Sequence, residues 1–329
     1  QNLALTVNQY STAMTLESFV ELMSELEKAK LLDKQVEFLP DTAELSRRII
    51  NKQSLTRPEL SVLLSYSKMF IEKELENALL LKDPFYENSL INYFPPPMRQ
   101  SLNKEILEHP LRKEIIRTII TNKLVNQLGG SIINEIRSSS GAKICDIARS
   151  HTMVCEIFDL DRIWEIVSNL SVKIPSEIKI EMLTDIAKVM RRGISWFVKN
   201  IKHPIDIKEA LDEYKNQTIH IAKVARKLLV GEAKTKFKNK ALRFTEAGVR
   251  KELAQEVAAL DILVSAFDIL YIAKQTGSKD DEVTNLYFIT GEILNLDWLR
   301  KTCDSLVDDS YWNRLSIQSI KDDFSRVDH

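Results

Sequence analysis

The sequence predicts an all-α fold, an irregular multi-helix bundle with no Rossmann fold in this segment. Glycine occurs only 8 times and proline 9 times in 329 residues, whereas average usage puts glycine near about 7%. A chain so poor in turn-forming residues cannot make the many tight turns of an all-β domain. Apolar residues also recur at three- and four-residue spacing, and no alternating strand pattern with hairpin signals continues for more than a few residues.

The first clear helix follows Thr56, which forms a capping box with Glu59 and has Pro58 in the first turn. A second begins after Pro175, and its apolar residues again share one face, opposite a charged one. The same reasoning predicts helices at Thr15–Lys30, Asp41–Asn51, Leu111–Leu128, Lys143–Phe158, Asp161–Ser171, Ile207–Leu229, Gly248–Gln275, Asp280–Leu294 and Tyr311–Ser325.

Proline and glycine mark the expected interruptions. The Tyr93-Phe94-Pro95 turn ends a helix, because the residue before proline is disfavoured in the α region. Gly129-Gly130 ends the next one, and the stretch 138–141 is expected to be a polar loop. His203-Pro204 separates two helical blocks, 1–203 and 204–329, although a single helical domain is the alternative.

Charge and cysteine content exclude several classes of protein. The 46 basic and 47 acidic residues leave a net charge of -1, which gives no global electrostatic reason to expect nucleic acid or acidic membrane as a partner. The longest apolar stretch, 260–270, is broken by Asp261 and Asp268, so no membrane-spanning helix is expected. Three scattered cysteines indicate reduced thiols and a cytoplasmic protein.

The sequence opens at Gln1, without an initiator methionine and without a signal-peptide pattern. We therefore expect a processed product or a segment of a longer polypeptide.

No complete catalytic or cofactor-binding motif is present. Neither glycine-rich nucleotide-binding pattern occurs. Cys145, His151, Cys155 and Glu156 are close in sequence, but they lack the paired short spacings of a structural zinc site. The sequence contains five histidines that could act as a base. It contains no G-x-S-x-G nucleophile elbow and no catalytic-cysteine motif to accompany any of them. We therefore predict no catalytic residue, no metal ligand and no bound cofactor.

The basic tract 234–240 and the four tryptophans are the remaining candidates for a binding role. The basic tract Lys234–Lys240 contains four lysines around Phe237, which suits binding of phosphates and stacking on a base, but a solvated loop or helix end is the simpler interpretation. The four tryptophans, Trp164, Trp196, Trp298 and Trp312, fall on amphipathic stripes, so we expect them in the core.

Several stretches of the sequence form an ordered set. The most extensive is L-T-R-P-E-L-S-V-L-L-S-Y-S-K, residues 55–68. The others are V-E-F-L-P (36–40), Y-F-P (93–95), H-P-L-R-K-E-I-I (109–116), N-K-L-V-N (122–126), V-C-E-I-F-D-L (154–160), R-R (191–192) before W-F (196–197), and G-E-I-L-N-L-D-W-L (291–299). Together, and in their order along the chain, they resemble the C-terminal helical region of the large-subunit class of NAD-dependent glutamate dehydrogenases.

The resemblance implies a parent enzyme that converts L-glutamate and NAD to 2-oxoglutarate, ammonia and NADH. In that family the glycine-rich dinucleotide fold and the catalytic residues precede this region, so the segment itself is expected to be non-catalytic. It is expected to pack on the upstream catalytic domain of the same polypeptide, to share in a homo-oligomer, and to have a structural, inter-domain or regulatory role. The best candidates for inter-domain contacts are Arg57, Glu59, Tyr93 and Phe94, because turns carry function more often than helix interiors.

The four candidate contact residues also have a simpler interpretation. Arg57 and Glu59 cap a helix, and Tyr93 and Phe94 end one. The alternative function is a free-standing helical interaction module that binds an acidic partner through residues 234–240.

Overall fold

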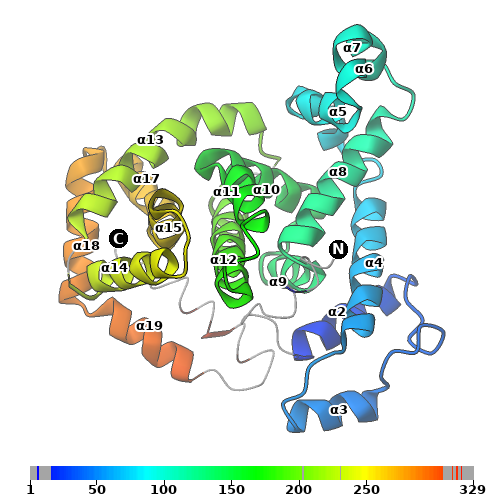
Figure 1. The fold of residues 1–329 in the computed structure, drawn as a ribbon, viewed down its shortest axis with the longest axis horizontal. Coiled ribbons are helices and arrows are strands. Elements are labelled where there is room, and N and C mark those ends of the chain that lie inside the picture. Colours follow the sequence, from blue (N-terminus) through cyan, green and yellow to red (C-terminus); the bar gives the residue numbers. More distant parts are fainter. Residues whose placement is uncertain are drawn as a thin grey trace. The chain divides into compact units, whose positions relative to one another are not determined.

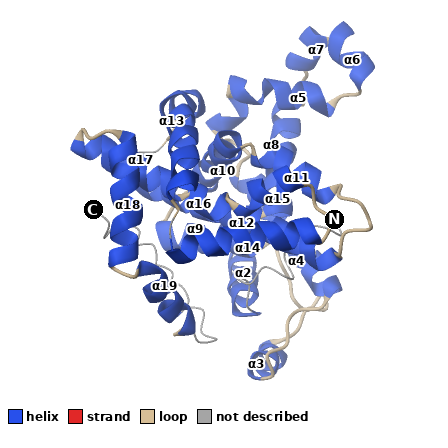
Figure 2. Cartoon of the chain, turned by 60° about the vertical axis from the view of Figure 1, so that its left-hand side comes forward, coloured by secondary structure: helices blue, strands red, loops and turns tan. Residues whose placement is uncertain are grey.

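The computed structural model describes residues 16–201, 204–229 and 231–306, together with Thr6, Asn313, Ser316, Ile317 and Ile320. Helices joined by loops make up this part of the chain, and no strand occurs within it (Figures 1 and 2). The predicted all-α fold is therefore confirmed.

The chain forms two compact units. The first consists of residues 1–151 and 201–208, and the second of residues 152–200 and 209–329. Their division falls inside helix α10 (Ile144–Phe158). His203, where we predicted a boundary, lies outside the described residues, and the division into 1–203 and 204–329 stays a prediction.

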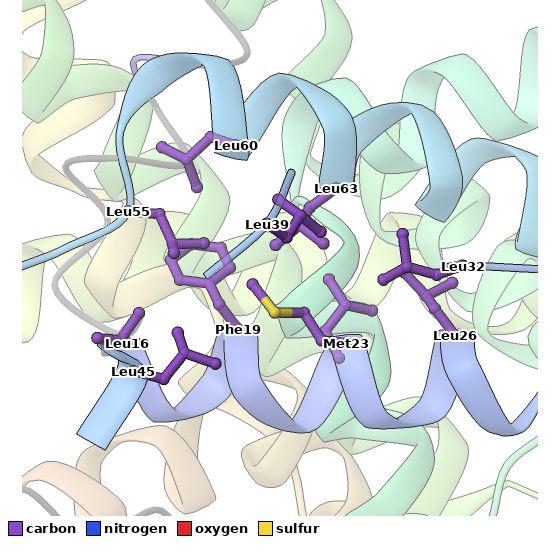
Figure 3. Close-up of a cluster of buried hydrophobic side chains, with 11 residues drawn as sticks. Leu16, Phe19, Met23, Leu26, Leu32, Leu39, Leu45, Leu55, Leu60 and Leu63 are labelled. Carbon is purple, nitrogen blue, oxygen red and sulfur yellow. The ribbon is translucent and has the colours of Figure 1, made fainter. Parts of the chain in front are cut away.

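The first unit places a hydrophobic core between α2 and α4. Its elements before α10 are α2 (Leu16–Lys28), α3 (Thr42–Ile50), α4 (Arg57–Glu74), η1 (Leu79–Lys82), η2 (Pro84–Tyr86), α5 (Glu87–Tyr93), α6 (Pro96–Ser101), α7 (Asn103–Leu107), α8 (Arg112–Gln127) and α9 (Gly130–Ser140). Phe19 and Met23 of α2 point toward Leu60 and Leu63 of α4, and all four are buried (Figure 3). The apolar stripes predicted from helical spacing thus meet in one core.

A glycine sets the spacing of α4 and α9 in this unit. A Cβ atom built on Gly130 would lie 2.0 Å from Oγ of Ser67. Only a residue without a side chain permits so close an approach of the two helices. Next to this contact, Oγ of Ser18 donates a buried hydrogen bond of 2.7 Å to Glu135, which ties α2 to α9.

The second unit is built around the 25-residue helix α12 (Ser176–Asn200). Its other elements are α11 (Leu160–Ser168), α13 (Ile207–Leu228), α14 (Gly231–Glu246), α15 (Lys251–Ala258), α16 (Leu260–Leu263), α17 (Ser265–Thr276), α18 (Asp280–Ile293) and α19 (Leu296–Ser305). Aromatic rings fill its core: Trp196 stacks on Phe267 at 5.2 Å between centroids, and Phe197 meets Phe267 edge to face at 5.1 Å. The indole Nε1 of Trp196 donates to Oδ1 of Asp268 at 2.8 Å, which satisfies both buried groups.

Non-glycine residues adopt the left-handed conformation where glycine is usual. Lys30, Phe38 and Lys52 have φ angles of 56°, 52° and 53°. Each follows a helix or a helical turn, and the backbone N–H groups there bond back as in a Schellman motif. The low glycine content is thus compensated locally by residues that accept backbone strain.

Several predicted boundaries are confirmed and others are wrong. Asp41 caps α3 through a side-chain bond from the Glu44 N–H, the Thr56–Glu59 capping box forms, and α5 ends at Tyr93 as predicted. The stretch 138–141 is not a loop, because α9 continues to Ser140 before Gly141 turns left-handed. Gly129 has a φ angle of 85° and ends the preceding helix, but Gly130 already belongs to α9.

The predicted helix Gly248–Gln275 is divided into three. Gly248 ends α14 instead, with a φ angle of 94°. Between α15 and α17 some backbone hydrogen bonds shorten from i−4 to i−3, as from Ile262 to Ala259 and from Phe267 to Val264. No glycine or proline marks these breaks, so no local sequence signal predicts them. The predicted helix Tyr311–Ser325 lies almost wholly outside the described residues.

Candidate functional site

The corner between α3 and α4 contains Arg57 and Glu59, two of the predicted contact residues. Glu59 accepts the backbone N–H of Thr56 at 2.7 Å and Nη1 of Arg48 at 2.8 Å. Arg48 also binds Glu44 at 2.7 Å, so one guanidinium joins the two helices. Glu59 is therefore a capping and bracing residue, while Arg57 is exposed and donates to Thr6 at 3.4 Å.

The electrostatics of this corner follow from those bonds. The guanidinium groups of Arg47 and Arg48 lower the pKa of the Glu44 carboxyl to about 2. Burial by itself raises the pKa of Glu59, but the hydrogen bonds from Arg48 and Thr56 outweigh it and leave that pKa below its ordinary value. Both carboxylates are therefore stabilised in the ionised form.

The turn at the end of α5 contains Tyr93 and Phe94, the other two predicted residues. Arg99 holds this turn, because its Nε donates to the Phe94 carbonyl at 2.7 Å and its Nη2 to the Asn92 carbonyl at 2.9 Å. The Phe94 ring lies 5.7 Å from the His109 ring. Tyr93 is 58% exposed, so this turn presents an aromatic side chain to solvent from a fixed backbone.

The structure does not bring the two predicted pairs together. Arg57 and Glu59 are at the start of the 18-residue helix α4, beside α3, whereas Tyr93 and Phe94 belong to the α5–α7 group at the other end of the first unit (Figures 1 and 2). Their assignment as inter-domain contacts stays a prediction for two separate surfaces.

A small hollow, open to solvent, lies between α2, α4 and α9. Leu22, Phe70 and Ile133 are among its lining residues. Arg137 is at its edge, with its guanidinium 5.2 Å from the centre of the Phe70 ring and 3.8 Å from the Glu25 carboxylate. The contacts of Arg137 join the helices around the hollow. The residues that line the hollow do not form a cluster of reactive side chains.

Lys68, in the Leu55–Lys68 stretch, is half-buried between α4 and α8. Its Nζ donates to Oδ1 of Asn122 at 2.7 Å, and burial lowers its pKa. On α8, Thr118 donates to Glu72 of α4 at 3.1 Å. These bonds cross-link α4 and α8.

The sequence-adjacent Cys145, His151, Cys155 and Glu156 do not converge. Nε2 of His151 is bonded to Gln127 at 2.8 Å in the interior, and in the described ranges no three histidine, cysteine or acidic side chains are grouped to hold a metal ion. None of Cys145, Cys155 and Cys303 forms a disulfide bond. His220 pairs with Asp281 at 2.9 Å on the surface, while His203 and His329 lie outside the described residues.

The basic tract Lys234–Lys240 is inside α14, which corrects the expectation of a loop or helix end. Lys240 does not face solvent freely, because its Nζ pairs with the buried Asp185 at 2.8 Å. The Phe237 ring is covered by the Arg226 guanidinium at 5.7 Å. Lys234 and Lys238 are exposed, so part of the tract still presents positive charge.

Two exposed apolar surfaces were missed by the sequence reasoning. Trp298, expected in the core, is 59% exposed, and the helix α18 before it exposes Leu286, Ile289 and Ile293. Those three share one face by their spacing, while Val283 and Tyr287 are buried on another. Trp196 is buried as expected, Trp164 is half-buried, and Trp312 lies outside the described residues.

The second surface is on the loop between α2 and α3, where Val36 and Phe38 are exposed. The sequence holds one signal for each surface. The segment that forms α18 is apolar on two faces, and Val36 and Phe38 are large apolar residues in a polar loop that precedes Pro40.

No helix among the described residues combines the length and the apolarity that a bilayer span requires.

Comparison with known proteins identifies the family to which the sequence is similar. The family described as "Glutamate dehydrogenase, C-terminal" matches residues 52–329. The NAD-specific glutamate dehydrogenase of Halomonas elongata is 29% identical over 326 residues, which are 99% of this chain and 20% of that protein. The protein of the same name from Pseudomonas aeruginosa is 28% identical over 98% of this chain and 20% of its own length.

A third relative of that name, from Mycobacterium tuberculosis, is 24% identical over 89% of this chain and 18% of its own length. The chain therefore spans about a fifth of the length of these relatives. Because the family match covers most of the sequence, the chain belongs to the glutamate dehydrogenase C-terminal family.

Proposed function

We propose that this chain is the non-catalytic C-terminal helical region of a NAD-dependent glutamate dehydrogenase polypeptide. The observation that carries the proposal is the match over residues 52–329 together with relatives about five times longer. In this proposal the remainder of the polypeptide binds NAD and converts L-glutamate to 2-oxoglutarate and ammonia, and the helical region binds no cofactor.

The proposed role of the region is structural or regulatory, through packing on the catalytic part. Two kinds of residue support it. Charged side chains such as Arg48, Glu59 and Lys240 are used to join helices. Large apolar side chains such as Phe38 and Trp298 are exposed instead, and exposed apolar groups that gather in one place mark docking surfaces. A homo-oligomer of the parent polypeptide belongs to the same proposal, and three cysteines outside any disulfide bond support a cytoplasmic setting.

The test compares the purified chain of 329 residues with the full polypeptide. We expect glutamate-dependent NADH formation by the full polypeptide and none by residues 1–329. Activity of the shorter chain would overturn the claim that the catalytic residues are elsewhere. The reading frame upstream of Gln1 supplies a second test, since the proposal requires a glycine-rich α/β segment there.

The exposed lysines of α14 favour one alternative, a module that binds an acidic partner through residues 234–240. Lys234 and Lys238 are exposed on this helix. Binding to an acidic peptide or to single-stranded nucleic acid that weakens steeply with salt, and is lost in Lys234→Gln with Lys238→Gln, would support the alternative. No binding at low salt would exclude it.

A further inference from the structure

The loop of residues 33–39, between α2 and α3, displays two large apolar side chains. Phe38 is 91% exposed and Val36 67% exposed. The loop is part of the V-E-F-L-P stretch noted in the sequence, and the helix packing described above does not use these two side chains. A phenylalanine exposed so fully contributes almost nothing to the core of its own unit.

Five interactions fix the shape and position of this loop. Oδ1 of Asp33 accepts the backbone N–H groups of Gln35 at 2.9 Å and Val36 at 3.2 Å. Nζ of Lys34 pairs with Glu27 of α2 at 2.8 Å. The Tyr66 hydroxyl of α4 donates to Glu37 at 2.6 Å, and Leu39 is buried in the core cluster. Phe38 is thus held in place by its neighbours and not by contacts of its own ring.

The backbone at Phe38 is strained for this residue type. Its φ angle is 52°, and the Leu39 N–H bonds back to the Lys34 carbonyl at 2.9 Å, as in a Schellman motif where glycine is usual. The two comparable positions in this unit carry Lys30 and Lys52, whose polar ends suit solvent. Among the left-handed non-glycine positions of the described residues, Phe38 alone combines strain with an exposed apolar ring, which points to a use outside this chain.

A third exposed apolar residue is near the same brace. Met69 is 51% exposed and is three residues after Tyr66, so the two share a face of α4. Tyr66 in turn holds Glu37, the residue between Val36 and Phe38. We call Val36, Phe38 and Met69 the loop surface. Single exposed apolar residues are ordinary, but several exposed apolar residues beside one fixed brace, an aromatic residue among them, are typical of an interface.

We propose that the loop surface is where this region docks on the preceding part of its own polypeptide, with the Phe38 ring inserted in an apolar pocket of that part. This inference rests on the proposed function. Its occupant is chosen from chain length and position: the relatives hold about four-fifths of their length outside the matched segment, and the loop lies on the N-terminal side of the family match, which begins at residue 52. Covalent linkage within one polypeptide raises the effective concentration of the preceding part at the loop surface, and a preorganised loop loses little entropy on docking.

Photo-crosslinking in the full polypeptide tests the proposal. p-Benzoylphenylalanine is placed at position 38 and, as a matched control, at Val172, which is 95% exposed in the loop before α12. We expect position 38 to give intramolecular crosslinks to peptides outside residues 1–329, at several times the yield from position 172. Crosslinks between two copies, or a yield no higher than from position 172, would overturn the proposal.

A second measurement separates docking from folding. Phe38→Asn is compared in the chain of 329 residues and in the full polypeptide. We expect the midpoint of thermal unfolding of the shorter chain to stay the same or rise, and proteolytic cleavage within 33–39 of the full polypeptide to increase at least tenfold. A lowered midpoint in the shorter chain would show that Phe38 serves the fold of its own unit, and unchanged cleavage of the full polypeptide would show that Phe38 does not dock; either result would overturn the proposal.

Failure here is distinguishable from failure of the proposed function. If crosslinking fails while the full polypeptide forms NADH from glutamate and residues 1–329 do not, the proposed function stands and only the docking surface is wrong. If the full polypeptide lacks that activity, the proposed function fails whatever position 38 contacts.

Discussion

The Asp185 carboxylate is buried within the second unit and forms an ion pair with Nζ of Lys240 at 2.8 Å. Their side chains are 5% and 18% exposed. Lys188 also approaches Asp185, at 3.5 Å, from a more exposed position. The pair joins α12 to α14, so the last lysine of the basic tract is part of the fold and not of a free charged surface.

We expect Lys240→Met to lower the free energy of unfolding by about 1–3 kcal/mol, because the buried Asp185 carboxylate would lose its ion pair with Lys240. Lys238→Met is the matched control, since Lys238 is exposed on the same helix, and its effect should stay within about 0.5 kcal/mol. Urea unfolding followed by circular dichroism measures both. Equal effects of the two substitutions would show that the pair does not stabilise α14.

The corner formed by Arg48, Glu44 and Glu59 predicts a particular pH dependence. A carboxyl whose pKa is lower in the folded state contributes stability above its unfolded pKa of about 4.3. That contribution is lost as pH falls toward the folded pKa, which for Glu44 is about 2. The expected window of acid sensitivity is therefore between about pH 4.5 and pH 2.

Two arginine substitutions separate the carboxyls in an NMR titration. Arg48→Met should raise the titration midpoints of both Glu44 and Glu59, because Arg48 bonds to both. Arg47→Met should raise only that of Glu44, to which it is bonded. A Glu59 midpoint that responds equally to the two substitutions would contradict the assigned geometry.

Two helical glycines should respond in opposite directions to alanine. A Cβ on Gly193 of α12 would lie 2.7 Å from a methyl carbon of Val154, so Gly193→Ala should destabilise by about 1–3 kcal/mol. A Cβ on Gly291 of α18 meets nothing nearer than 3.9 Å, and Gly291→Ala should stabilise by about 0.5–1 kcal/mol because glycine disfavours the helix. Thermal unfolding of the two variants checks the signs, and two losses of similar size would refute the packing at Gly193.

The loop surface yields a prediction about the isolated chain. Phe38→Asn should raise the free energy of unfolding by up to about 1 kcal/mol, since asparagine tolerates the left-handed conformation and the exposed ring has little burial to lose. Leu39→Ala, next in sequence but buried, should lower it by about 2–4 kcal/mol. Denaturant titration of both variants tests the contrast, which would fail if Phe38→Asn were the more damaging change.

Helix existence and many helix ends were predictable because their causes are local. The Asp41 cap, the Thr56–Glu59 box and the stop at Tyr93 each depend on residues within a few positions. The breaks within 248–275 were not predictable, because no glycine or proline accompanies them and the backbone there remains near the α region. The buried ion pair of Lys240 was not predictable either, because its partner Asp185 is 55 positions earlier in the sequence.

The sequence by itself determined that the chain is helical, that no glycine-rich nucleotide loop occurs in it, and which family it resembles, since these depend on composition, periodicity and ordered motifs. Tertiary structure decided which apolar side chains are left outside. Trp196 and Trp298 both fall on amphipathic stripes, yet one is 8% and the other 59% exposed. The physical reason is that burial depends on contacts between segments distant in sequence, whereas helix formation depends on neighbours within one or two turns.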